Sequence, residues 1–286
     1  MTRTTALACT GIVVATLLFD GAASAAEGAV ADASDVAKPL TTEPEAGGTH
    51  HRVSTPAGPV HVFLPAGYDR RSAGIVVYVH GLYVHVDDAW RDHGLAQQFA
   101  ASRRNALFIA PEAPSASNEK PVWAHLQRLI GSTLRRAHLQ RPRGPLTVAG
   151  HSAAYRTIVP WLKERSLHNI ILIDAMYGNQ RDFRAWLKSR PGNRMTLVVR
   201  GTGKWADPFI RSLPFAKSVR RIPDSIEELS RPQRNARLLA LRSQYGHNEL
   251  ITEGKVLPVL LRRTPLLSLP LRGKATRPNL KRRSVR

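Results

Sequence analysis

The stretch Pro145–Trp161, PLTVAGHSAAYRTIVPW, decides the fold of this chain. Its apolar run Leu146–Ala149 is typical of a buried strand, and residues with helical spacing follow Gly150-His151-Ser152-Ala153-Ala154. A strand, a sharp turn centred on a serine and a helix are the setting of a nucleophile elbow, whose flanking residues must be very small. Gly150 meets this requirement, whereas Ala154 stands where glycine is usual. Ser152 is therefore either a nucleophile or a serine that caps a helix after a strand.

Further buried strands are predicted on both sides of this stretch. Short apolar runs without alternation are typical of strands covered on both faces, as in a parallel sheet. They alternate with segments of helical periodicity from about residue 50 to 262. This alternation predicts one α/β domain with a doubly wound, mostly parallel sheet of about eight strands and helices on both faces. The expected strands include 60–64, 74–79, 106–110, 146–149, 169–173, 195–199 and 237–241. The expected helices are 88–103, 121–138, the one that follows the elbow to about 166, 182–190 and 225–237, and a closing helix or loop runs from 249 towards 261, interrupted by Pro258.

A serine hydroxyl is a weak nucleophile, so Ser152 should be accompanied by an imidazole base and a carboxylate. In open α/β sheets, sites lie at the carboxyl ends of the strands. Two histidines follow Ser152 in the chain. His168 precedes a predicted strand and so belongs to the opposite edge, whereas His247 follows the last strand. Order and edge together select His247 as the base.

Two aspartates compete for the role of the acid. Asp174 ends the strand that follows the serine helix, and Asp207 lies in the loop after the next strand. A carboxylate at the end of so apolar a run is costly to bury without a partner such as an imidazole. We therefore favour Asp174, with Asp207 as its rival.

An oxyanion formed by attack needs preorganised N–H donors. The Ala153 N–H directly follows the candidate nucleophile, and the Leu82 N–H lies in the loop His80-Gly81-Leu82 after an earlier strand. Gly81 lets the backbone come close. Gly81 and Tyr83 are also candidates for contacts with the substrate.

These motifs carry a resemblance to a known superfamily. The pair His80-Gly81, the segment Gly150–Ala154, Asp174 and His247 occur in the order found in the α/β-hydrolases, which residues 50 to 262 resemble. The segment HSAAYR and the strand end ILIDAMYG at 171–178 are similar to those of uncharacterised exported bacterial members.

The resemblance implies an exported serine hydrolase that cleaves an ester or amide through an acyl-enzyme. Its expected partner is a small-molecule or peptide acyl substrate. The resemblance also supports Asp174 as a site residue and places Tyr155, Arg156 and Tyr177 near the site. It says little about which substrate is used.

No metal or cofactor is expected from the sequence. The residues His80, His85, Asp87, Asp88 and His93 are close in sequence, but their spacing fits neither HExxH nor a two-metal HxHxDH pattern. Neither GxGxxG nor a P-loop is present, so no nucleotide cofactor is indicated.

The two ends of the chain are expected to lie outside the domain. Residues 1–25 have the charged, apolar and small-residue regions of a secretory signal peptide, which predicts a periplasmic or secreted protein. Residues 26–49 lack periodicity and are interpreted as a flexible linker. The one cysteine, Cys9, lies within the signal, so the mature chain would have no disulfide.

Residues 263–286 are interpreted as a basic tail. The net charge is +21, and from Arg262 onward there are nine basic residues and no acid. We expect a solvated tail. The alternative function is a non-catalytic protein on a hydrolase fold that binds an anionic cell-envelope polymer through this charge. No nucleic-acid-binding motif accompanies the charge, so specific nucleic-acid binding is not expected.

Overall fold

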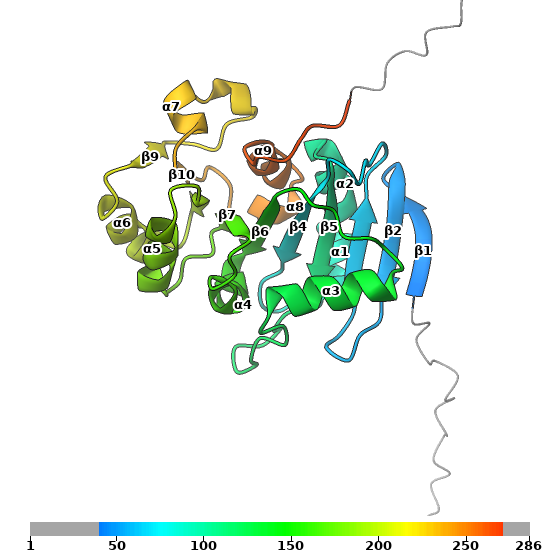
Figure 1. Ribbon diagram of the computed structural model, residues 1–286. Helices are drawn as coiled ribbons and strands as arrows, with labels where there is room; N and C mark the ends of the chain where they lie inside the picture. Colours follow the sequence, from blue (N-terminus) through cyan, green and yellow to red (C-terminus); the bar gives the residue numbers. More distant parts are fainter. Residues whose placement is uncertain (1–39, 271–286) are drawn as a thin grey trace, which may run out of the picture. The chain divides into compact units, whose positions relative to one another are not determined.

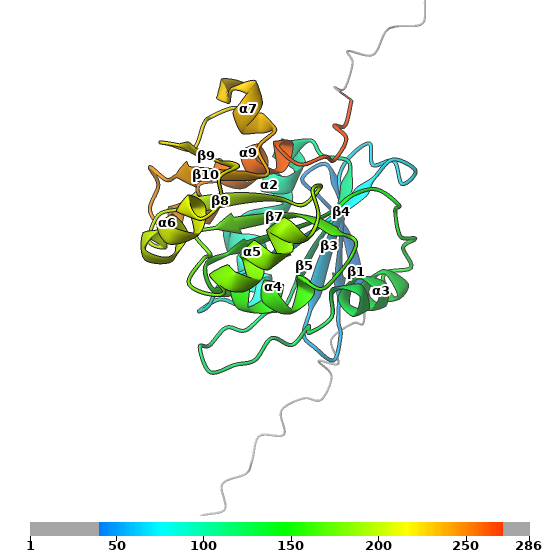
Figure 2. The same cartoon turned by 60° about the vertical axis from the view of Figure 1, so that its left-hand side comes forward.

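Buried apolar runs form the centre of the sheet. β4 (Gly74–Val79), β5 (Ala106–Pro111) and β6 (Leu146–His151) are buried at every position, and β7 (Leu167–Ile173) at every position except His168. These four strands pair in parallel with one another. Such strands need helices on both faces, and both faces are covered (Figures 1 and 2). The structure, a computed structural model, describes residues 40–270.

Within these residues, the sheet order is β1-β2-β3-β5-β4-β6-β7-β8-β10-β9. Pairing is antiparallel from β1 to β5 along this order and parallel beyond it. The doubly wound, mostly parallel sheet with helices on both faces is confirmed. The remaining strands are β1 (Leu40–Glu45), β2 (Gly48–Val53), β3 (Val60–Leu64), β8 (Arg194–Val199), β9 (Ala216–Val219) and β10 (Leu238–Arg242).

The predicted number of about eight strands is too low, because an extra strand lies at each edge. β1, LTTEPE, is polar and almost entirely exposed, and β9, AKSV, is short and half exposed. Edge strands pair on one side only and tolerate proline, so they need no apolar pattern. Their sequences therefore give little strand signal.

Both predicted domain boundaries are wrong. The linker was expected to extend to residue 49, but β1 and the start of β2 are paired strands of the sheet. The tail was expected from residue 263, but Leu266 is buried and Ser268 forms a β-bridge with Arg104. The domain therefore includes residues 40–49 and 263–270. The predicted signal peptide, residues 26–39 of the linker and residues 271–286 of the tail lie outside the described residues.

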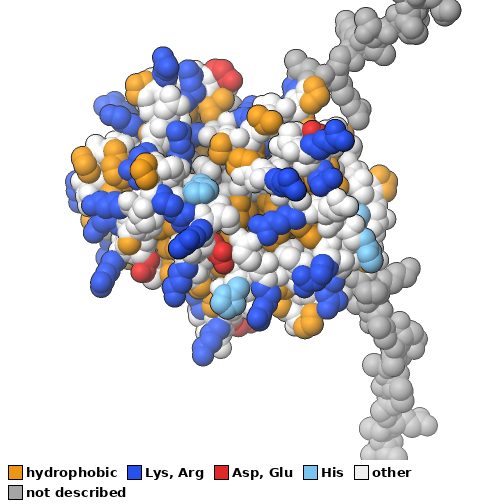
Figure 3. Space-filling view, in the orientation of Figure 1, with side chains coloured by type: hydrophobic (Ala, Val, Ile, Leu, Met, Phe, Trp, Pro, Cys, Tyr) orange, Lys and Arg blue, Asp and Glu red, His pale blue; other side chains and the backbone are white. Residues whose placement is uncertain are grey.

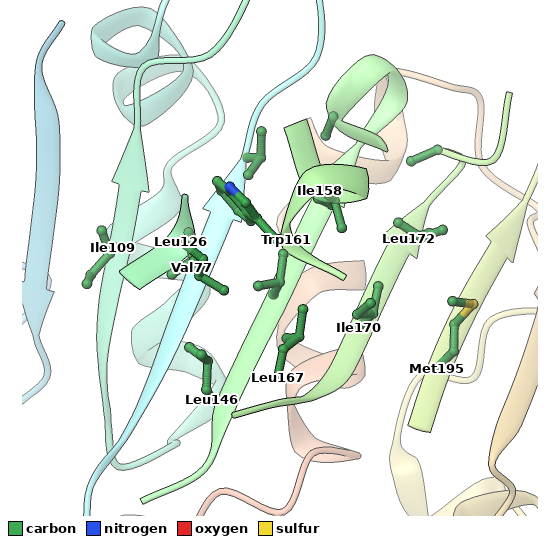
Figure 4. Packing of buried hydrophobic residues seen from close by; sticks show 14 of the residues in the cluster. Val77, Ile109, Leu126, Leu146, Ile158, Trp161, Leu167, Ile170, Leu172 and Met195 are labelled. Atoms are coloured by element: carbon green, nitrogen blue, oxygen red, sulfur yellow. The ribbon is translucent and has the colours of Figure 1, made fainter. Parts of the chain in front are cut away.

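Strand side chains alternate between two apolar layers, one on each face. Val77 faces one layer and its neighbour Val76 the other. Figure 4 shows Val77, Ile109, Leu172 and Trp161 among the apolar residues of the cluster on the first face. That face is covered by α3 (Leu126–Arg136), α4 (Tyr155–Trp161), α5 (Gln180–Ser189) and α6 (Gly203–Arg211), and the other by α1 (Val86–Asp92), α2 (Leu95–Ser102), α8 (Glu249–Thr252) and α9 (Val256–Arg262).

Several predicted helices are wrong in extent. The closing segment from 249 towards 261, expected to be interrupted at Pro258, is divided into α8 and α9, and Pro258 lies within α9. The helix expected over 88–103 is divided into α1 and α2, because Gly94 adopts the left-handed conformation at φ 56°. The helix expected from Pro121 begins at Leu126. The helix expected over 225–237 is reduced to a 3-10 turn (Ile226–Glu228) and α7 (Arg231–Arg234), each opened by a serine capping box.

Two surface properties bear on the predicted partners. Lys and Arg side chains are spread over the face in Figure 3, with few acids among them, so the positive charge is not confined to the tail. Among the described residues, no helix is both long enough and apolar enough to cross a bilayer.

Candidate active site

The elbow is built by the end of β6 and the start of α4. Ser152 has a φ of 56°, a left-handed conformation that few non-glycine residues adopt, and it opens a 3-10 turn (Ser152–Ala154) before the helix. A Cβ at Gly150 would lie 2.7 Å from both Ala154 Cβ and Ile158 Cδ1, so this position requires glycine. Ala154 itself fits because only its methyl group points at Gly150. The Ser152 side chain caps neither helical segment.

Ser152, His247 and Asp174 lie in one hydrogen-bonded chain. Ser152 Oγ is 3.0 Å from His247 Nε2, and His247 Nδ1 is 2.7 Å from Asp174 Oδ2. An ionised carboxylate only accepts hydrogen bonds, so His247 donates from Nδ1. In the neutral ring Nε2 then has the lone pair that accepts the serine proton. These three side chains have the geometry required of a nucleophile, its base and the group that orients the base.

Asp174 is fixed by the loop after β8. Its carboxylate is fully buried and accepts hydrogen bonds from the backbone N–H groups of Arg200, Gly201 and Thr202, at 2.9 to 3.0 Å, and from the Thr202 hydroxyl at 2.7 Å. Burial alone raises the pKa of the Asp174 carboxyl. The hydrogen bonds from His247, Gly201 and Thr202 outweigh burial and hold that pKa well below its usual range. Asp174 is therefore ionised and rigid.

The rival acid lies elsewhere. Asp207 is on α6, where one carboxylate oxygen is 2.5 Å from Arg242 Nη2. Its carboxylate accepts a hydrogen bond from this arginine, and within residues 40–270 it forms no hydrogen bond or ion pair with His247. Of the two aspartates that the sequence left open, the structure brings only Asp174 to the imidazole.

Two backbone N–H groups border the space in front of Ser152. A Cβ at Gly81 would lie 2.8 Å from Ser152 Cβ, so the loop after β4 passes directly against the serine. The Leu82 N–H has no hydrogen-bond partner among residues 40–270. The Ala153 N–H lies in the first turn of a helical segment, where no intrahelical acceptor is available. The loop that contains Leu82 and the turn that contains Ala153 therefore both adjoin Ser152.

His80 fixes the loop of residues 80–82 that follows β4. Its Nδ1 donates to the Gly81 carbonyl at 2.8 Å, and its Nε2 accepts from the Ala113 N–H at 3.0 Å. Next in the chain, the Tyr83 N–H donates to the Ser115 carbonyl at 2.7 Å. These bonds fix the loop on either side of Leu82.

A serine elbow, an acid after the next strand and a histidine after the last strand of a mostly parallel sheet occur here in the order Ser, Asp, His. The chain has the α/β-hydrolase fold. This fold was expected from the sequence and is now seen in three dimensions.

Comparisons with known proteins gave distant structural matches alone. No protein-family model matches the chain, and no curated protein matches its sequence. Similar solved structures include an S-formylglutathione hydrolase of Agrobacterium tumefaciens, with 10% identity, 80% of this chain and 100% of that chain covered, and a TM-score of 0.49. A fluorophosphonate-binding serine hydrolase of Staphylococcus aureus has 12% identity, 79% and 100% coverage, and a TM-score of 0.48. The feruloyl esterase module of Clostridium thermocellum has 12% identity, 77% and 86% coverage, and the same TM-score. Similarities this distant give no information about the substrate of this protein.

A pocket of about 370 Å³ opens beside the serine. Its lining includes Leu82 and Tyr83 from the loop after β4, His247 from the loop after β10, and Ile251 from α8. Tyr83 is 88% exposed and forms part of the mouth. A larger hollow, about 870 Å³, is lined by Leu146 and other residues at the amino ends of the strands, the edge opposite the serine. The smaller pocket is therefore the substrate site candidate.

Two predicted substrate contacts lie beside the pocket and not in its lining. The Tyr177 ring is edge-on to His247 with centroids 6.3 Å apart, and Tyr155 lies 6.4 Å from Tyr177. Arg156 donates to the carbonyls of Ala116 and Glu119, which holds the loop after β5. These residues surround the imidazole and the elbow.

Sequence reasoning missed His151, the residue before the serine. It is 5% exposed, its ring centroid lies 4.6 Å from that of His247, and its Nε2 donates to the His247 carbonyl at 3.0 Å. Burial, and secondarily the neighbouring His247, lowers the pKa of His151 to about 4. His151 is thus a neutral support for the loop that carries His247. A polar residue at the end of so apolar a strand was its only signal.

The histidines and aspartates from residue 80 to 93 do not converge on one point. Asp87 binds Arg52 through two hydrogen bonds, and Asp88 pairs with Arg91. His80 and His85 both face Glu112, at 3.2 and 3.4 Å. Their side chains serve separate local contacts.

Proposed function

We propose that this protein is a serine hydrolase that cleaves an ester or amide bond through an acyl-enzyme. The observation that carries the proposal is the unbroken chain from Asp174 through His247 to Ser152 at the border of a pocket. A hydrogen-bonded serine, imidazole and buried carboxylate with adjacent free N–H groups is the arrangement that acyl transfer requires.

Each residue has one role in the proposed reaction. Ser152 Oγ attacks the acyl carbon while His247 Nε2 accepts the hydroxyl proton. The oxygen that becomes negative is bound by the N–H groups of Ala153 and Leu82, each worth about 10²-fold in rate or more. His247 then gives the proton to the leaving group. A water molecule repeats these steps on the acyl-enzyme, and Asp174 stays ionised throughout.

The lining of the pocket favours a short, uncharged acyl group. Leu82, Val84 and Ile251 supply apolar surface, and no Asp, Glu, Lys or Arg is among the lining residues. A charged acyl group would lose its hydration there without gaining a partner. The pocket volume is at the small end of the range for ligand sites.

A fluorophosphonate probe tests the nucleophile. We expect the wild type to be labelled stoichiometrically, Ser152→Ala to remain unlabelled, and Ser166→Ala, at an exposed serine on the opposite edge, to be labelled like the wild type. Equal labelling of Ser152→Ala would overturn the proposal. A panel of aryl esters and anilides of increasing chain length would then separate ester from amide hydrolysis and measure the acyl pocket.

We also propose that the protein is exported after cleavage before Ala26. The proposal rests on the charge and apolar pattern of the first 25 residues. Intact-mass measurement of protein from cell fractions tests it: the mature chain should begin at Ala26 and be found outside the cytoplasm. An uncleaved chain confined to the cytoplasm would contradict it.

A further inference from the structure

A second series of hydrogen-bonded polar side chains lies at the antiparallel end of the sheet, between strands β1, β2 and β3 and helix α1. Asp87 Oδ1 is 2.8 Å from His61 Nε2, and His61 Nδ1 is 2.8 Å from His50 Nε2. His50 Nδ1 in turn faces Glu43 Oε1 at 2.9 Å and Glu45 Oε2 at 3.2 Å. Both imidazoles are buried, at 4% and 3% exposure. None of these residues takes part in the proposed hydrolysis.

The donor and the acceptor of each of these hydrogen bonds can be assigned, starting from Asp87. Asp87 accepts two hydrogen bonds from the Arg52 guanidinium, so it is ionised and can only accept from His61 Nε2. A neutral His61 then has its lone pair on Nδ1. His50 must donate to that lone pair from Nε2. In the neutral ring, the lone pair of His50 is consequently on Nδ1, the atom that faces Glu43 and Glu45.

Three electron-pair donors therefore converge on one point. The ligand atoms of Glu43, Glu45 and His50 all lie within 4.8 Å of one another. Two carboxylates and an imidazole lone pair repel one another, so this arrangement needs either a cation between the three groups or a proton on His50 Nδ1. Ligand atoms about 2.1 Å from a common Zn²⁺ lie roughly 3 to 3.5 Å apart, close to the 2.9 and 3.2 Å between His50 Nδ1 and the two glutamates.

The surroundings hold these ligands in place. Trp90 of α1 stacks on both imidazoles, with centroids 4.6 Å from His50 and 4.7 Å from His61, and its Nε1 donates to Glu45 Oε2 at 2.9 Å. Histidine metal ligands typically donate their second ring N–H to an outer acceptor that ends in a carboxylate. Here His61 and Asp87 provide that outer chain. Glu43 is exposed, so an ion can reach the site from solvent.

We propose that Glu43, Glu45 and His50 bind one divalent transition-metal ion, with Zn²⁺ as the best fit. Two carboxylate oxygens and one imidazole nitrogen suit Zn²⁺, and a water molecule would complete four-coordination. An imidazole ligand disfavours Ca²⁺ and Mg²⁺. Both glutamates come from edge strand β1 and the histidine from β2. The ion would thus fasten the edge strand to the sheet, and its role is structural.

Isothermal titration of the metal-free, untagged mature protein with Zn²⁺ tests this site, with Co²⁺ absorption as a second probe of coordination. We expect one ion per chain, a visible Co²⁺ band typical of four-coordination, and an increase in melting temperature on binding. His50→Ala should abolish binding. Glu43→Gln, at an exposed position that folding tolerates, should weaken binding about tenfold or more and leave the metal-free melting temperature unchanged.

A matched control is available on the same strand. His51 follows His50 on β2, points to the opposite face and contacts Thr42, so His51→Ala should bind Zn²⁺ like the wild type. Failure of the folded wild type to bind Zn²⁺ at millimolar concentration would overturn the proposal, since a proton on His50 Nδ1 would then satisfy the two glutamates. Binding that survives Glu43→Gln undiminished would overturn it as well.

Discussion

The pairs Asp174–His247 and Asp87–His61 have nearly the same first link, with carboxylate-to-imidazole distances of 2.7 and 2.8 Å. They differ in what lies beyond the imidazole. His247 faces the hydroxyl of Ser152 at the border of a pocket, whereas His61 faces a second buried imidazole. By our two proposals, the same kind of pair supports proton transfer in one place and a metal ligand in the other.

The surroundings of the two carboxylates explain the difference. Asp174 is fully buried and held by backbone N–H groups of one loop, so it stays in place when the charge on His247 changes. Asp87 is 43% exposed and is neutralised by Arg52. A carboxylate–imidazole pair becomes catalytic only where the backbone also brings a strained nucleophile and N–H donors to the same point. Four predictions test this contrast, starting with the largest expected effect.

Replacing the buried carboxylate should have the largest effect. Asp174→Asn should lower kcat on an aryl ester about 10⁴-fold, because the amide cannot hold His247 in the reactive tautomer. Asp207→Asn, which removes only the pair with Arg242, should leave kcat unchanged. Steady-state kinetics of both variants decides between the two acids. A loss in Asp207→Asn equal to that in Asp174→Asn would refute our assignment.

The buried support of His247 should make stability depend on pH. The pKa of His151 is lowered from 6.5 to about 4, so the unfolded chain takes up a proton between these values and the folded chain does not. The free energy of unfolding should therefore decrease by about 3 kcal/mol as the pH falls from 6.5 to 4. His151→Gln should remove this part of the slope in urea titrations. Exposed His168→Gln should retain it, and an unchanged slope in His151→Gln would contradict the prediction.

Adding a methyl group at Gly81, beside the serine, should lower kcat/KM more than it lowers the free energy of unfolding. In Gly81→Ala, the new Cβ would lie 2.8 Å from Ser152 Cβ and force one of the two segments to move. We expect kcat/KM to fall about 10²-fold, because small displacements of reacting groups are costly. Gly192→Ala is the control, since its Cβ would meet nothing within 4 Å. Equal activity of both variants would show that the loop adapts without cost.

Replacing Asp87 should affect stability and, by our proposal, Zn²⁺ binding through His61 and His50, but not hydrolysis. Asp87→Asn leaves Arg52 without its ionic partner, and we expect a loss of about 1 to 2 kcal/mol in the free energy of unfolding. Hydrolysis should be unchanged, because neither residue contacts the triad. Asp88→Asn, in an exposed pair with Arg91, should change the free energy of unfolding by less than about 0.5 kcal/mol. A loss of hydrolysis in Asp87→Asn would contradict this prediction, because it would show that the two regions are energetically coupled.

Much of this α/β-hydrolase fold could be predicted because its central strands are buried on both faces. Runs such as Ile75–Val79 and Ile170–Ile173 must be apolar throughout, which gives a local signal. The helix between Leu95 and Ser102 could not be bounded in this way. Its start depends on the left-handed backbone of Gly94, which periodicity does not reveal.

The sequence by itself determined the central parallel strands and the order Ser152, Asp174, His247. Strands buried on both faces require continuous apolar runs, and the order of the three residues can be read directly along the chain. The tertiary structure decided which aspartate meets His247, since Asp174 and Asp207 both follow strands and only packing selects between them. It also decided that β1 belongs to the sheet and that Glu43, Glu45 and His50 converge. An edge strand buries little apolar surface, so its place depends on pairing with β2, a contact that no local pattern specifies.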